Sequence, residues 1–151
     1  MTVLSNTDYF RFIKGKYGPY AHDIDVIAER IKEYETYHKA STNEAYELLM
    51  KILISDRTQQ KLDFYMPFIS RAADFTNHFS DSASVEGAGT ALFIIQRSQC
   101  ASAEQVISGF KQWSDDKAKR FSEADIVSAI TELEKAGFIQ KTLCGYQVSI
   151  S

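Results

Sequence analysis

Side chains that commonly perform chemistry are few and scattered in this sequence of 151 residues. Its three histidines are His22, His38 and His78. No two of them stand four residues apart, and no Cys or carboxylate completes a ligand spacing near them, so we expect no zinc site. Cys100 and Cys144 are far apart, lack metal-type spacing and are expected to be reduced thiols. A catalytic thiol requires an activating base or an electropositive setting, and neither cysteine has one. Lys141 near Cys144 is only weak support for such a setting.

The remaining candidates for catalysis have ordinary structural explanations. Asp115 and Asp116 are adjacent, which is typical of a capping or solvated turn rather than an acid–base pair. Ser70 lies inside a predicted helix and therefore forms no nucleophile elbow. Gly87 and Gly89 lack the preceding strand and the Gly-Lys-Ser/Thr ending of a phosphate loop, and close helix packing explains them better. We therefore expect no enzyme activity, no catalytic residue, no metal and no cofactor.

The most distinctive stretch is Ile13-Lys14-Gly15-Lys16-Tyr17-Gly18-Pro19-Tyr20-Ala21-His22. Its glycines permit backbone angles closed to other residues, and Pro19 suits the first turn of a following helix. One interpretation is a strand-to-helix connector that two tyrosines hold against the core. The other is a partner-binding surface. The candidate partner-binding residues are Lys14, Lys16, Tyr17, Tyr20, Asp23 and Glu29.

Composition places the chain among ordinary soluble globular proteins. Hydrophobic residues make up 44% and charged residues 25%, with a net charge of −3. This balance argues against a nucleic-acid binder that relies on a broad basic surface. No apolar run is long enough to span a membrane, and the N-terminus lacks the pattern of a secretory signal. The expected location is the cytoplasm.

Four helices are predicted before residue 100. They run over Tyr20 to Tyr37, Ser41 to Ile54, Arg57 to Phe79 with a break or kink at Pro67, and Val85 to Arg97. The third helix is apolar on two faces and is expected at the centre of the core. The fourth contains the apolar segment Ala91 to Ile95 and should also be buried.

The last third of the chain has the element order of a winged helix. A helix capped by Ser102 precedes a charged turn over residues 115–120, and a second helix runs from Ser122 to Gly137. Alternating residues in 138–142 and 146–150 then predict a hairpin. The predicted class is mainly α (α+β), a helical domain with a small strand element and a winged-helix-like end. We expect one domain over 1–151, with 1–8 flexible, 9–100 helical and 101–151 winged-helix-like.

A winged helix suggests DNA binding, but the charges of this one weigh against it. The candidate recognition helix carries Glu123, Asp125, Glu132 and Glu134 against Lys135 alone. Such a helix would repel phosphates and favours contact with protein. A DNA reader would have to use the basic residues Lys117, Lys119, Arg120 and Lys141. The interpretation we prefer pairs the basic residues of the turn with Asp115, Asp116 or Glu123. The acidic face of the first helix is either solvated or imitates a nucleic-acid backbone to a basic partner.

Several segments together resemble the C-terminal domain of DarG-type macrodomain antitoxins. The matching segments are Gly15-Lys16-Tyr17-Gly18-Pro19-Tyr20, Arg71-Ala72-Ala73-Asp74-Phe75, Phe110-Lys111-Gln112-Trp113-Ser114, Lys117-Ala118-Lys119-Arg120-Phe121-Ser122 and Ala136-Gly137-Phe138-Ile139. The resemblance covers nearly the whole chain from Tyr9. It implies a non-catalytic domain that binds and inhibits a DNA ADP-ribosyltransferase toxin, with a proposed mimicry of single-stranded DNA.

The family's N-terminal macrodomain has no counterpart in this chain, so its hydrolase activity is not carried over. The resemblance leaves two expectations open, a stand-alone protein and a domain cut from a longer macrodomain protein. Two other functions remain as alternatives. One is a winged-helix transcription regulator, and the other is a scaffold or dimerisation domain with an exposed apolar patch.

Overall fold

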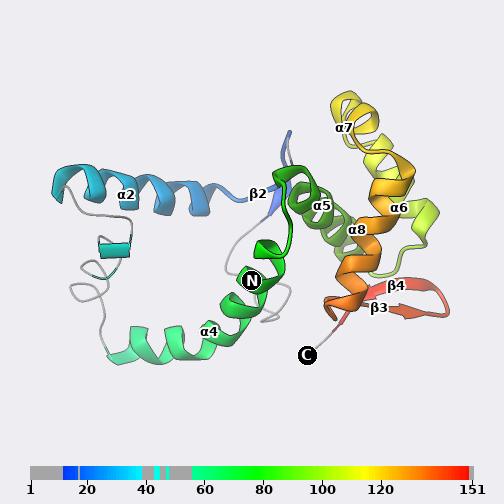
Figure 1. The fold of residues 1–151 in the computed structure, drawn as a ribbon. Coiled ribbons are helices and arrows are strands. Elements are labelled where there is room, and N and C mark those ends of the chain that lie inside the picture. The colour runs from blue at the N-terminus through cyan, green and yellow to red at the C-terminus, as the bar shows by residue number, and fades with distance from the viewer. Residues whose placement is uncertain (1–11, 17, 39–42, 45–46, 48–55, 150–151) are drawn as a thin grey trace.

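The computed structural model describes residues 12–149, apart from 17, 39–42, 45–46 and 48–55. Helices dominate, and two short antiparallel strand pairs accompany them, which confirms the predicted mainly α class (Figure 1). The helices are α2 (His22–His38), α4 (Asp56–Asn77), α5 (Ser82–Ser98), α6 (Ala103–Lys111), α7 (Asp115–Arg120) and α8 (Glu123–Lys135). The strands are β1 (Ile13–Lys14), β2 (Pro19–Tyr20), β3 (Ile139–Thr142) and β4 (Gly145–Val148). Residues 1–8, which were expected to be flexible, and most of the helix expected over 41–54 lie outside the described residues.

The C-terminal half has the winged-helix topology, and α5 belongs to it. Strands β3 and β4 form the wing, with Ile139 opposite Val148. Ala101, which follows α5, exchanges two backbone hydrogen bonds with Tyr146 and so adds a one-residue third strand. Gly145 has a φ of +129°, and a side chain there would meet the Ala101 backbone, so the wing can approach this closely only with glycine. Helix α5 therefore shares its core with the segment from 101 onward that the sequence predicted to be winged-helix-like.

The hydrophobic core lies between α5, α6, α8 and the wing. Its members are at most 9% exposed and are Ala88, Ala91, Ile95, Ala101, Val106, Phe110, Phe121, Ile126, Ala129, Ile130, Leu133, Phe138 and Ile139. The predicted burial of the 91–95 segment is confirmed, because Ala91 and Ile95 are fully buried. Close packing also explains Gly87, where a Cβ would lie 3.1 Å from the Phe121 ring, but it does not explain Gly89, where a Cβ would meet nothing within 4 Å.

Local sequence signals set the ends of α8. The Ser122 hydroxyl accepts from the Asp125 backbone N–H while the Asp125 carboxylate accepts from the Ser122 N–H, a complete capping box. Gly137 ends the helix with a φ of +72°. The charged turn predicted over 115–120 is wrong, because these residues form α7 with Ser114 as its N-cap. A short helix replaces the turn because Ser114 satisfies an amide of the first turn and acidic residues precede basic ones along it.

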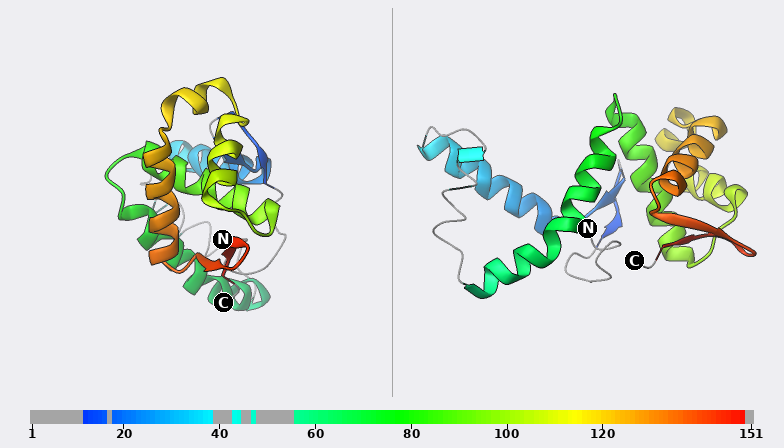
Figure 2. Two further views of the ribbon diagram at one scale, coloured as in Figure 1. Left: turned by 90° about the vertical axis from the view of Figure 1, so that its right-hand side faces the viewer. Right: turned by 60° about the horizontal axis from the view of Figure 1, so that its bottom comes forward.

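Two long helices extend from the compact part of the molecule. Figures 1 and 2 show α2 and the N-terminal half of α4 projecting away from α5–α8. The prediction that α4 is central to the core is wrong for this half, since Phe64 is 59% exposed and Met66 is 44% exposed. Its second half packs against the core through the partly buried residues Phe68, Ala72 and Phe75, and Phe79 follows just after the helix ends.

Arg71 fastens the packed half of α4 to the end of α8. One guanidinium nitrogen donates to the Ala136 and Gly137 carbonyl oxygens, each at 2.9 Å. The same guanidinium lies 5.0 Å from the Phe138 ring centre. These bonds satisfy carbonyls that the helix itself leaves without partners.

Cys100 and Cys144 form a disulfide, which corrects the expectation of two reduced thiols. Their Cα atoms lie 6.2 Å apart although 44 positions separate them in sequence. The pairing of Ala101 with Tyr146 places the two cysteines side by side, because each lies one or two residues from that pair.

Candidate partner-binding site

The distinctive Gly-Pro stretch folds as a small hairpin. Strands β1 and β2 pair Ile13 with Tyr20 and Lys14 with Pro19, and the Gly15 N–H donates to the Gly18 carbonyl at 2.9 Å. A Cβ on Gly15 would lie 2.7 Å from the Gly18 oxygen, so a larger residue would open the turn. The hairpin ends directly at α2, whose first helical residue is His22.

The hairpin is anchored to the winged helix through Trp113. The indole Nε1–H donates to the Gly15 carbonyl at 2.7 Å. Lys14 donates from Nζ to the Gln112 carbonyl at 2.9 Å, and its ammonium lies 5.3 Å from the Trp113 ring centre. Residues almost 100 positions apart thereby hold the start of α2 against the connection between α6 and α7.

Lys117 lies beneath this anchor as a fully buried cation. Its Nζ donates to the Glu86 carboxylate at 2.6 Å and to the Thr90 hydroxyl at 3.0 Å. Three aromatic rings, those of Phe110, Trp113 and Phe121, stand 5.0–5.9 Å from the ammonium. A charge without contact to water needs such partners, because an unpaired buried charge is strongly destabilising.

Glu86 joins the buried cation to the surface. Its second oxygen accepts from Arg120 at 2.8 Å, and Arg120 also pairs with Asp116 at 3.1 Å. Partial burial opposes the charged carboxylate, but the hydrogen bonds and charges of Lys117 and Arg120 outweigh it and lower the pKa of Glu86. The predicted pairing of the basic trio with Asp116 is thus confirmed for Arg120. The role in DNA binding that a transcription regulator would give Lys117 is excluded by its burial.

Acidic and apolar side chains cover the first turns of α2. Asp23, Asp25 and Glu29 are exposed, and Ile24 and Ile27 are 42% and 50% exposed. A hydrogen bond with Asp25 raises the pKa of Tyr20, with smaller contributions from burial and from the charges of Asp25 and Glu29. The Tyr20 hydroxyl and His22 Nδ1 lie 3.4 Å apart. We call the exposed surface of Tyr20, Asp23, Asp25 and Glu29 with Ile24 and Ile27 the α2 surface.

The structure divides the candidate partner-binding residues into two groups. Tyr20, Asp23 and Glu29 lie on or beside the first turns of α2, and Lys16 is exposed in the hairpin turn. Lys14 is directed toward Gln112 and Trp113, so its contacts are those of an anchor. Tyr17 lies outside the described residues.

Sequence reasoning missed the central role of Glu86 and Lys117. One signal was present, because Trp113, Lys117 and Phe121 recur every four residues and place a lysine within an aromatic stripe. Its acidic partner lies on α5, 31 positions earlier in the chain, and nothing in the local pattern identifies it.

The described part of the chain gives little support for a metal site, a membrane-spanning helix or a ligand pocket. No group of three His, Cys, Asp or Glu residues there could hold a metal ion, and no described helix is long and apolar enough to cross a membrane. A pocket of about 330 Å³ between α5 and α8 is lined by Asp81, Arg120, Asp125 and Glu132 among others. Each of these four already bonds within the chain.

The charges on α8 are partly neutralised by neighbouring lysines. Lys111 pairs with Glu123 at 2.8 Å, and Lys135 pairs with Glu132 at 2.8 Å. The Asp125 carboxylate is occupied in the helix cap, while Glu134 is exposed. The exposed face of α8 therefore offers phosphates no cationic surface.

Comparison with protein-family models, with curated proteins and with solved structures found no match to this chain.

Proposed function

We propose that this chain is a non-catalytic antitoxin-type domain that binds and inhibits a toxin of the DNA ADP-ribosyltransferase type. The segments that resemble DarG-type antitoxins motivate the proposal. The observation that carries it is the α2 surface, which projects from the compact fold and combines carboxylates with apolar side chains. Such a mixed surface suits a protein partner, since single-sign charge steers association and apolar contacts supply affinity.

Mimicry of a nucleic acid follows from the same surface. The carboxylates of Asp23, Asp25 and Glu29 are held on one rigid helix, and they can occupy sites that a DNA-modifying toxin reserves for phosphates. The anchor at Trp113 fixes the start of this helix against the winged helix, so the carboxylates are pre-organised before binding. A toxin with a basic DNA channel is the partner that this arrangement fits.

The direct test measures binding and inhibition together. The purified domain is titrated into the toxin encoded beside it, with DNA modification as the readout and single-stranded DNA as a competitor. We expect D23K/E29K to weaken binding by about tenfold or more, because attraction becomes repulsion. The matched control E134K reverses an exposed acid on α8 and should leave binding unchanged. The proposal fails if the wild-type domain neither binds the toxin nor blocks DNA modification.

A winged-helix transcription regulator is the alternative, favoured by the topology that includes the Ala101–Tyr146 pair. Such a regulator would use Lys119 and Lys141, which are exposed on α7 and on the wing. Its DNA affinity should fall steeply with salt and drop on charge reversal of these two lysines. If the DNA affinity is unchanged by both charge reversals, the regulator is excluded.

Stable self-association through α2 and α4 would instead support a scaffold or dimerisation domain.

The proposal includes a cytoplasmic location and an optional N-terminal macrodomain in a longer form of the chain. The disulfide removes the argument from free thiols for a cytoplasmic location. We retain the cytoplasm because a toxin that modifies DNA acts there. A macrodomain attached at the N-terminus in a longer form would add ADP-ribose removal to inhibition.

A further inference from the structure

We propose that the Cys100–Cys144 disulfide is a thiol-responsive switch that fastens the tip of the wing to the start of α6. The cytosolic setting rests on the proposed function, but the redox equilibrium of the bond is measured on this chain alone, so the two proposals can fail separately. In cytosolic proteins a disulfide is most often redox-sensing or catalytic, whereas in secreted proteins it is structural. The surroundings of the two sulfur atoms favour a redox-sensing disulfide.

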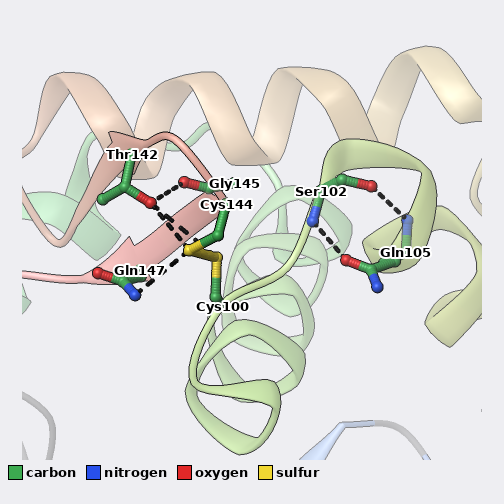
Figure 3. Close-up of a disulfide and its surroundings, with 7 residues drawn as sticks. All are labelled: Cys100, Ser102, Gln105, Thr142, Cys144, Gly145 and Gln147. Atoms are coloured by element: carbon green, nitrogen blue, oxygen red, sulfur yellow. Dashed lines mark hydrogen bonds between the residues drawn. A yellow bond between two sulfur atoms is a disulfide. The ribbon is translucent and has the colours of Figure 1, made fainter.

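Cys100 is partly exposed, so a thiol can approach its side of the disulfide, and the sulfur of Cys144 lies where its thiolate is stabilised. Cys144 is exposed, and the neighbouring Leu143 is fully exposed at the tip of the wing. The Gln147 side-chain amide donates to the Cys144 sulfur at 3.5 Å (Figure 3). The Thr142 hydroxyl lies 3.2 Å from the same sulfur and 2.8 Å from the Gly145 carbonyl that accepts its proton. After reduction this proton can turn to the thiolate, so the reduced form gains a second donor.

These contacts favour reduction of the disulfide by a small thiol such as glutathione. A glutathione thiolate attacks the Cys100 sulfur, the disulfide bond breaks, and Cys144 leaves as a thiolate that Gln147 and Thr142 stabilise. A second glutathione attacks the glutathione sulfur of the mixed disulfide and releases Cys100. Two protein sulfurs gain two electrons, and two glutathione molecules become one oxidised glutathione. Stabilising the leaving thiolate makes the disulfide easier to reduce.

Reduction would loosen the wing without unfolding the core. The disulfide links the residue Cys100, which precedes α6, to Cys144 at the tip of the wing. Beside it, two backbone hydrogen bonds join Ala101 to Tyr146 at 3.0 and 2.8 Å. We expect these bonds to open more often once the cross-link is gone, while the capped helices α6 and α8 stay formed. Ser102 and Gln105 complete the capping box that holds the start of α6 (Figure 3).

The test equilibrates the full chain in buffers of varied reduced and oxidised glutathione and counts thiols by alkylation and mass spectrometry. We expect reduction within the range of buffers that reduces other regulatory disulfides. Q147L should shift the equilibrium about tenfold toward the disulfide, because a donor to the thiolate is lost. The matched control is Q140L, which removes an amide on the facing strand, opposite Gln147. It should leave the equilibrium unchanged.

Hydrogen exchange on the oxidised and reduced wild-type chain supplies a second readout that needs no variant. Exchange at Ala101 and Tyr146 should accelerate by about tenfold or more on reduction, and exchange within α8 should not change. Resistance to a large excess of reduced glutathione would make the bond purely structural and overturn the proposal. An equal response of Q147L and Q140L, or unchanged exchange at Ala101 and Tyr146, would also overturn it.

Discussion

Replacing Lys117 with methionine tests whether the buried cation organises the contact between the hairpin and the winged helix. The substitution keeps the length of the side chain up to the ammonium, and it removes a charge that is fully buried and bonded to Glu86 and Thr90. Breaking a buried ion pair from one side costs about 3–5 kcal/mol. Glu86 keeps Arg120 at 2.8 Å, so we expect a loss near the lower end, about 3 kcal/mol.

A loss of this size leaves a typical domain folded but clearly weakened. For a chain of this length it corresponds to a fall in Tm of roughly 6–12 °C. Urea unfolding followed by far-UV circular dichroism measures the free energy. Trp113 is the sole tryptophan of the chain, so its fluorescence reports on the anchor directly. The control is K119M, which changes an exposed lysine on the same helix and should cost less than about 0.5 kcal/mol.

A double-mutant cycle with E86Q separates the ion pair from general packing effects. The double variant should be more stable than the sum of the single losses predicts, with a coupling energy of about 2 kcal/mol. A loss below about 1 kcal/mol for K117M, or a coupling energy near zero, would refute the reasoning. In that case the rings of Phe110, Trp113 and Phe121 would hold this region without help from the charge.

Three further predictions concern the Trp113 anchor, the Arg71 contact and the carboxylate of Glu86. W113F removes the indole donor to Gly15 and should cost about 1 kcal/mol, with faster hydrogen exchange in β1 and β2 as the specific sign. R71M removes charged donors to the end of α8 and should cost about 2 kcal/mol in urea unfolding. Protease cleavage in α4 should also increase in R71M; unchanged cleavage would contradict the anchoring role of Arg71. Because the pKa of Glu86 is lowered in the folded state, its stabilisation is present above the ordinary Glu pKa of about 4.3 and is lost as pH falls further. The stability of E86Q should therefore depend less on pH below that value than the stability of the wild type.

The sequence alone determined the features that depend on near neighbours in the chain. The capping box of Ser122 and Asp125 and the helix end at Gly137 depend on residues only a few positions apart. Their pattern can therefore be recognised in the sequence alone. The continuous apolar segment 91–95 predicted a buried part of a helix, and this signal too is local in the chain. These local signals, read in order, were enough to give the mainly α class and the winged-helix order.

Only the tertiary structure decided the contacts between distant segments. No periodic signal links Glu86 to Lys117, or Trp113 to Gly15, because each bond depends on how helices pack and not on their spacing in sequence. The disulfide was missed for the same reason, since Cys100 and Cys144 meet only where Ala101 pairs with Tyr146. The misplacement of α4 has a related cause. An apolar stripe shows which face of a helix favours burial, but only the neighbouring elements determine whether anything covers it.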